Sequence, residues 1–176
     1  MLQNQRFTCL RPLREEDAPL MLEWMRDKNI TEHLRADFEN KTADDCLRFI
    51  RDSAKEKRHL HLAVTNEDGI YMGTVSLKNI SPENHTAEFG ICMRRSAMGT
   101  GLAGAAMKEI LSLGYEKLGL DAVFWCVSVH NERANRFYRK NGYITVSQVP
   151  DQITQNYAQY LQDELIWYCA KKPAGK

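Results

Sequence analysis

Apolar and polar residues alternate along this chain in patterns that predict short strands and amphipathic helices. Residues 60–65 and 70–77 are apolar runs of strand length, and Gly69 between them suits a tight hairpin turn. Cys46, Phe49 and Ile50 recur at helical spacing and predict a helix that buries one face. In chain order, the expected elements are a strand (7–11), two helices (14–25 and 44–56), three antiparallel strands (60–65, 70–77 and 86–93), a helix ending near 118, a strand (122–129), a helix between 131 and 142, and two last strands (143–149 and 164–169).

A turn with glycines at positions 99, 101 and 104 joins the strand 86–93 to the helix that follows it. Glycine has no Cβ, so the main chain can curl tightly there and approach a ligand. The first N–H groups of a helix have no acceptor within the helix and can point at an anion. The turn therefore predicts a phosphate-binding site, and the strand and helix that follow it strengthen this prediction.

That second strand and helix, residues 122–129 and 131–142, carry clear end signals. Asn131 is a good N-cap, basic residues occupy the last turn, and Gly142 stands where a left-handed C-terminal cap is expected. Ala134, Phe137 and Tyr138 follow at i, i+3 and i+4, so they share one face of the helix. This face is predicted to pack inward and to carry the Tyr138 hydroxyl toward the sheet.

Together, these two strand–turn–helix units resemble the GCN5-related N-acetyltransferase (GNAT) superfamily. The later helix of that family often has the pattern Asn-x-x-Ala-x-x-x-Tyr-x-x-x-Gly-Phe/Tyr. Here the pattern is met at every position, by Asn131, Ala134, Tyr138, Gly142 and Tyr143.

The family's cofactor-binding turn usually reads Gln/Arg-x-x-Gly-x-Gly/Ala, and this chain meets that pattern only in part. Gly99 and Gly101 match, while Ser96 stands where Gln or Arg is usual. The guanidinium expected beside the pyrophosphate would then come from Arg94 or Arg95. The alternative for these two arginines is a solvated strand end.

The resemblance implies an α/β fold in a single N-acetyltransferase domain over residues 1–170, with residues 171–176 as a disordered tail. The central sheet is expected to be mixed and mostly antiparallel, with about seven strands, splayed between strands 4 and 5 and flanked by about four helices. The resemblance also implies acetyl-CoA as the acetyl donor. The residues expected to bind it are Ile91, Cys92, Met93, Arg94, Arg95, Gly99, Thr100, Gly101, Leu102, Ala103, Gly104, Asn131 and Tyr138.

Acetyl transfer needs a neutral amine, a stabilised oxyanion and a proton for the leaving thiolate. Tyr138 stands where the family uses a general acid, and its alternative is a buried core tyrosine. Glu88 is similar to the bases or water-ordering groups of some relatives, and its alternative is a structural hydrogen-bonding role. Neither a Ser-His-Asp nor a Cys-His pattern is apparent, which favours direct attack by the amine over an acyl-enzyme route through Cys92 or Cys126.

The acceptor is expected to be a small-molecule amine, such as a nucleotide-linked amino sugar, or a protein N-terminus, because residues 24–27 resemble the first helix of those two branches. Trp24 and Phe38 are candidates to stack on it, and Arg26 and Arg35 to meet a phosphate. The alternative is that Trp24 belongs to the core and that the two arginines are solvated. The polar residues 148–162 suit a loop that covers a ligand.

Two other classes of function compete with the enzymatic one. A non-catalytic acyl-CoA-binding sensor or regulatory module would need the same glycine turn, but it would have no need of Tyr138. Dinucleotide binding of Rossmann type is disfavoured because the glycine turn follows an antiparallel hairpin instead of opening a βαβ unit, and because no acidic residue ends the following strand.

The composition of the chain bears on its partners, its location and the presence of a metal. In 176 residues, 24 Lys and Arg balance 23 Asp and Glu, so the net charge of +1 favours neither nucleic acid nor a membrane surface as partner. No run approaches the length of a membrane span, and no secretory signal opens the chain, so we expect a cytoplasmic protein. The five cysteines and five histidines lack metal-ligand spacing, and we predict no metal. The sequence allows a monomer or a homodimer.

Overall fold

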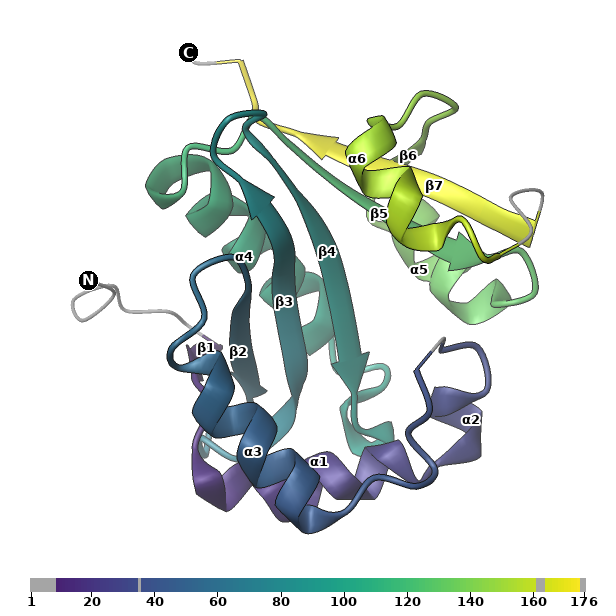
Figure 1. Ribbon diagram of the computed structural model, residues 1–176. Coiled ribbons are helices and arrows are strands. Elements are labelled where there is room, and N and C mark those ends of the chain that lie inside the picture. Colours follow the sequence, from purple (N-terminus) through teal and green to yellow (C-terminus); the bar gives the residue numbers. More distant parts are fainter. Residues whose placement is uncertain (1–8, 35, 161–163, 175–176) are drawn as a thin grey trace. The chain divides into compact units, whose positions relative to one another are not determined.

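Seven strands form one mixed sheet in the computed structural model, which describes residues 9–34, 36–160 and 164–174 (Figure 1). The strand order is β1-β2-β3-β4-β5-β7-β6. Neighbours run antiparallel in the β1–β2, β5–β7 and β6–β7 pairs, while β4 and β5 are parallel. The strands are β1 (Leu10–Pro12), β2 (Leu60–Thr65), β3 (Tyr71–Ser81), β4 (Thr86–Met93), β5 (Ala122–Ser128), β6 (Ile144–Thr145) and β7 (Leu165–Lys171).

Four longer helices occupy the positions that periodicity predicts, and shorter helical pieces are added to them. The longer helices are α1 (Ala18–Met25), α3 (Ala43–Ser53), α4 (Leu102–Lys117) and α5 (Glu132–Lys140). Two four-residue helices, α2 (Lys28–Thr31) and α6 (Asp151–Thr154), stand where loops are expected, since four residues are too few to show a helical period. Shorter 3-10 turns in the described part of the chain include η1 (Glu15–Asp17), η2 (Arg95–Ala97) and η3 (Gln155–Tyr157).

The chain divides into two compact units. Unit one is the part up to Ser76 together with Ile91–Ile110, and unit two is Leu77–Gly90 with everything from Leu111 onward. Strands β3 and β4 pass from one unit into the other. The prediction of a single domain over residues 1–170 stays a prediction.

The core of unit one is built by α1, α3 and the strands behind them. Met21, Trp24 and Ile50 from the helices pack with Ala63 and Tyr71 from β2 and β3, and all five are at most 5% exposed. The indole Nε1 of Trp24 donates a 2.9 Å hydrogen bond to the Tyr71 hydroxyl. That oxygen also lies 2.7 Å from Oγ1 of Thr74, so the polar atoms of this core are satisfied.

Unit two is organised around β5, which pairs with β7 along its whole length, from Ala122↔Lys171 to Ser128↔Leu165. Its parallel ladder with β4 is short and covers only Thr86–Glu88 opposite Ala122–Phe124. A ladder this short is expected for strands that separate after Glu88.

Several boundaries differ from the predicted ones. Strand β6 is only two residues long, although Val146 N still donates to Trp167 O of β7 at 2.9 Å. Strand β3 continues four residues beyond 77, although Asn79 within it has a φ of 48°. Lys171 pairs with Ala122, so β7 reaches the start of the predicted tail. Part of the first predicted strand, residues 7 and 8, lies outside the described residues.

Candidate active site

The glycine turn of unit one leaves open main-chain donors at the start of a long helix. Helix α4 begins at Leu102, and the first main-chain bond at its N-terminus joins Ala105 N to Gly101 O at 3.1 Å. Within the described part of the chain, the N–H groups of Gly101, Ala103 and Gly104 have no hydrogen-bond acceptor. These donors and the positive end of a 16-residue helix suit an anion.

The turn needs glycine for its conformation and not for lack of space. Gly99 and Gly101 have φ values of 78° and 86°, where a side chain is strained, yet a Cβ added at either would meet nothing within 4 Å. Thr100 fixes the turn from within, because its Oγ1 donates to Ala97 O at 2.6 Å and accepts from Leu102 N at 3.4 Å. The predicted glycine turn is therefore present as a preformed loop, and its contact with a phosphate stays a prediction.

The two arginines before the turn are both engaged with carboxylates of unit one. Arg94 forms a bidentate pair with Glu23, with both distances 3.0 Å, and its Nη1 donates to the Tyr71 carbonyl at 3.1 Å. Arg95 forms a bidentate pair with Asp27 at 2.8 and 2.7 Å, and this guanidinium holds the pKa of Asp27 at about 2. Their charges are largely compensated, so an anion at the turn would depend mainly on the main-chain amides.

Strand β4 comes unusually close to β3 at the residues predicted to bind the cofactor arm. A Cβ added at Gly73 would stand 2.4 Å from Cys92 O and 2.9 Å from Met93 Cα. One residue further on, Arg94 N donates to Met72 O at 2.8 Å. Gly73 therefore fixes how near the main chain of Cys92 and Met93 can lie to the neighbouring strand.

In unit two, helix α5 buries Tyr138 in an aromatic cluster. Tyr138 is 6% exposed, and its ring centroid lies 5.2 Å from those of both Trp125 and Tyr168 and 6.4 Å from that of Phe89. The helix begins as predicted, because Asn131 Oδ1 accepts from Ala134 N at 3.1 Å. Gly142 ends it with a φ of 81°. The cap accounts for Asn131 structurally and leaves its predicted cofactor contact a prediction.

Glu88, the other predicted catalytic residue, is buried at 2% exposure in unit two. Its carboxylate accepts hydrogen bonds from Asn79, Asn156 and Tyr157. None of the ion pairs among the described residues involves Glu88. Two of these partners, Asn156 and Tyr157, lie 68 and 69 positions from Glu88, so no local pattern in the sequence indicates them.

The residues predicted to bind the acceptor differ in how far they are exposed to solvent. Trp24 is 4% exposed and bonded to Tyr71, which agrees with the core alternative, and Phe38 packs on it edge to face at 5.1 Å. Arg26 is exposed, and Arg35 lies outside the described residues, as do residues 161 and 162 of the predicted covering loop.

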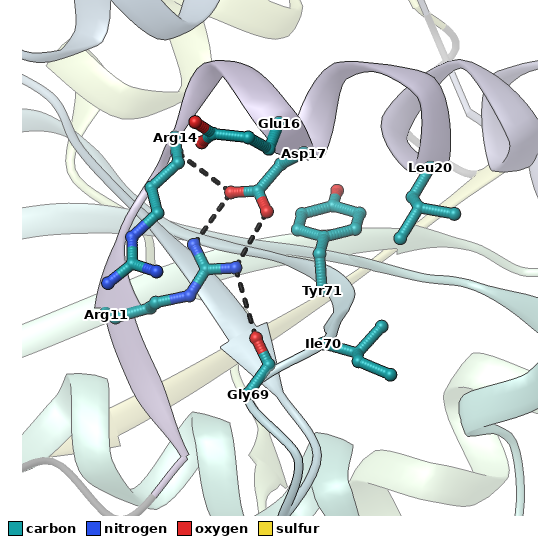
Figure 2. Close-up of a pocket in the computed structure, with 8 residues that line it drawn as sticks. All are labelled: Arg11, Arg14, Glu16, Asp17, Leu20, Gly69, Ile70 and Tyr71. Carbon is teal, nitrogen blue, oxygen red and sulfur yellow. Dashed lines mark hydrogen bonds and ion pairs between the residues drawn. The ribbon is translucent and has the colours of Figure 1, made fainter.

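A hollow of about 530 Å³ in unit one is lined by residues for which the sequence predicts no binding or catalytic role (Figure 2). Figure 2 shows the Arg11 guanidinium between Asp17, which it contacts at 2.7 and 2.8 Å, and the carbonyl of Gly69. Asp17 also accepts from Arg14 N at 2.9 Å. These bonds tie η1 to β1 and to the β2–β3 turn, and the charge of Asp17 is matched by Arg11, so we assign the hollow no ligand.

All five cysteines are thiols in the structure. Burial, together with the nearby Glu109 carboxylate, raises the pKa of Cys9 to about 12. Burial also raises the pKa values of Cys46 and Cys169. Among the described residues, no group of three or more metal-ligating side chains comes together, and no helix is both long and apolar enough to cross a membrane.

Comparison with known proteins identifies the family. A family model described as "Acetyltransferase (GNAT) domain" matches residues 8–144, more than half of the chain. The chain belongs to the GNAT family. The glycine turn and the Asn131–Tyr143 pattern of this GNAT protein both fall inside the matched residues.

Relatives of this GNAT chain include acetyltransferases of two named kinds. Spermidine N(1)-acetyltransferase of Escherichia coli K12 is 32% identical over 139 residues, which cover 76% of this chain and 71% of the relative. The "Putative ribosomal N-acetyltransferase YdaF" of Bacillus subtilis is 27% identical over 105 residues. That second match spans 60% of this chain and only 56% of the relative's length.

Solved structures of GNAT proteins share the fold. A spermidine N-acetyltransferase from Vibrio cholerae, in complex with CoA and spermine, has a TM-score of 0.75 at 17% identity and covers 92% of this chain and 94% of that one. The microcin C7 self-immunity acetyltransferase MccE, in complex with acetyl-CoA and AMP, has a TM-score of 0.73 at 18% identity, with 93% and 91% coverage. At these identities, the likeness concerns the fold.

Proposed function

We propose that this protein is an N-acetyltransferase that moves the acetyl group of acetyl-CoA to a primary amine, by direct attack in a ternary complex. The observation that carries the proposal is the set of open N–H groups at Gly101, Ala103 and Gly104, at the head of α4 in a chain of the GNAT family. Converging main-chain donors at a helix N-terminus bind anions, and the diphosphate of acetyl-CoA is an anion of this kind.

Acetyl-CoA supplies the activated acetyl group and a thiol leaving group. We propose that the turn from Gly99 to Gly104 binds its diphosphate, with Arg95 as the more exposed of the two neighbouring cations. The main chain of Ile91, Cys92 and Met93 is proposed to pair with the pantetheine arm.

For the proton transfer, we propose Tyr138 as the acid that protonates the leaving thiolate. Its family pattern is complete, and its position in a rigid aromatic cluster would hold the phenol in one orientation. The predicted role of Glu88 as a base or water-ordering group stays a prediction, as does a cytoplasmic location.

The acceptor is proposed to be a small amine, with polyamines placed first because the relatives matched over the largest share of this chain are named for spermidine. Nucleotide-linked amino sugars and protein N-termini remain the other classes that the sequence favours. Each of them presents a primary amine, so the proposed chemistry is the same for all three.

The test is thiol release from acetyl-CoA with a panel of spermidine, spermine, nucleotide amino sugars, aminoglycosides and short peptides. We expect one class to stimulate release, and we expect Tyr138→Phe to reduce kcat by roughly 100-fold or more. Acetyl-CoA binding, measured by calorimetry, should survive in Tyr138→Phe and weaken in Gly101→Ala, since Gly101 has a φ of 86°.

A binding module is the alternative that this experiment separates. If acetyl-CoA binds but no amine raises thiol release, and Tyr138→Phe matches the wild type, the catalytic proposal fails while acyl-CoA binding stands. If wild-type protein gives no heat with acetyl-CoA, both fail.

A further inference from the structure

The carboxylate of Glu88 is surrounded by hydrogen-bond donors. Oε1 accepts from Nδ2 of Asn79 at 2.7 Å and from Nδ2 of Asn156 at 2.8 Å, and Oε2 accepts from the Tyr157 hydroxyl at 2.6 Å. An ionised carboxylate has about four acceptor positions, so most of them are occupied. The side chain is 2% exposed, which leaves little access for water or for a substrate amine.

Two of the three donors belong to one segment, residues 151–157, formed by α6 and η3. Apolar contacts hold the same segment: Ile153 is 3% exposed and packs with Phe124 and Trp167, and the Tyr157 ring meets Trp167 edge to face at 5.2 Å. Figure 1 shows α6 beside β5 and β7. The bonds to Glu88 add a polar attachment to β4.

We propose that Glu88 is a positioning residue, which fixes the 151–157 segment on β4 and so sets the affinity for the acceptor. This rests on the proposed function in one respect, that the segment borders the acceptor. The attachment itself depends only on contacts within unit two. Its three partners satisfy the polar atoms of a side chain that is buried here, since a buried polar group without hydrogen bonds would be costly.

A carboxylate accepts from all three donors together, whereas a carboxamide can meet all three only if the Tyr157 hydroxyl turns from donor to acceptor. In Glu88→Gln, one acceptor oxygen becomes an NH₂ group that faces either two amide donors or a hydroxyl, although the volume is unchanged. In Tyr157→Phe, the 2.6 Å bond is lost while the contact with Trp167 is kept. In Asn156→Ala, one of the two bonds to Oε1 is lost. Gln155→Ala is the matched control, because Gln155 is the exposed neighbour of Asn156 in the same turn.

The first test is hydrogen exchange of the 151–157 amides, followed by mass spectrometry in the absence of any substrate. We expect Glu88→Gln, Tyr157→Phe and Asn156→Ala each to speed exchange there by about 10-fold or more, with no change in α4 and none in Gln155→Ala. If all three variants exchange at the wild-type rate, the proposal is overturned. If Glu88→Gln does not fold, the other two variants decide the question alone.

The second test separates positioning from proton abstraction. With an amine that the wild type acetylates, we expect Glu88→Gln and Tyr157→Phe alike to raise the amine KM about 10-fold and to change kcat less than 3-fold, with both limbs of the pH–rate profile retained. A kcat loss of about 100-fold and a lost limb in Glu88→Gln, not reproduced by Tyr157→Phe, would assign Glu88 as the base and overturn the proposal. If no amine is acetylated, the proposed function fails and the exchange test still decides the attachment.

Discussion

Gly73→Ala should displace the main chain on which acetyl-CoA is proposed to lie. The added Cβ would stand 2.4 Å from Cys92 O, 2.6 Å from Met93 Sδ and 2.9 Å from Met93 Cα, whereas ordinary contacts begin at 3.4 Å. The thioether can swing aside, but the other two atoms belong to the main chain. Relief of the shortest contact therefore needs a separation of the two strands by about 1 Å.

The size of the effect follows from that displacement. Overpacking of a closed site costs about 1–3 kcal/mol, and two of the three contacts are with main chain, so we expect a loss near the upper end in urea-induced unfolding. A shift of about 1 Å in groups that orient a substrate can reduce activity roughly 100-fold. We expect acetyl-CoA affinity by calorimetry to fall along with stability.

Two control variants test whether the clash with the main chain causes the effect of Gly73→Ala. In Gly90→Ala, which changes a glycine of β4, the new Cβ would meet only the flexible end of Lys78, at 3.4 and 3.6 Å, so we expect a change within about 0.5 kcal/mol and normal binding. Trimming the thioether in Gly73→Ala/Met93→Ala should not restore binding, because the clash with the Cys92 carbonyl remains. Full recovery in that double variant, or a Gly73→Ala protein with wild-type stability and affinity, would show the reasoning to be wrong.

Three further predictions concern unit one. Arg95 lowers the pKa of Asp27 from 3.8 to about 2, so the contribution of this pair to stability is complete above pH 4 and is lost as the pH falls toward 2. In Asp27→Asn, the loss of stability between pH 4 and pH 2 should therefore be smaller than in the wild type, as urea unfolding at each pH would show. An unchanged pH dependence would mean that the pair does not contribute. Tyr71→Phe should cost about 1–3 kcal/mol by leaving the Trp24 indole N–H without its acceptor, as thermal and urea unfolding would detect. Cys9, with its pKa raised to about 12, should resist iodoacetamide at pH 8 in the folded protein and react only after unfolding, as mass spectrometry of the labelled peptide would report.

The sequence predicted well those strands and helices whose bounds are set by their own apolar runs and cap residues. The bounds of β2 and β4 are those expected from their apolar runs, and α5 begins at Asn131 and ends before Gly142 because the cap residues specify both ends. The positive φ of Gly99 was likewise foreseeable, since a tight turn before a helix requires it.

Features that depend on distant partners were not predictable in the same way. Gly73 in a strand signals that something approaches closely, but its sequence neighbours do not say that this is the carbonyl of Cys92. The arginine pair before the turn suggested phosphate contacts, yet Arg95 meets Asp27 from 68 positions away. The surroundings of Glu88 were hidden for the same reason, because tertiary contacts alone assemble them.

The place of β7 has a consequence for how unit two is made. Strand β6 has a single neighbour, β7, and β7 also covers the open edge of β5, although both partners precede it in the chain. During synthesis, β5 therefore leaves the ribosome with one edge unprotected until residues 165–171 have followed, and such an edge invites pairing with other chains. A nascent chain stalled before Leu165 should consequently recruit chaperones or aggregate, whereas one released after Lys171 can close its own sheet.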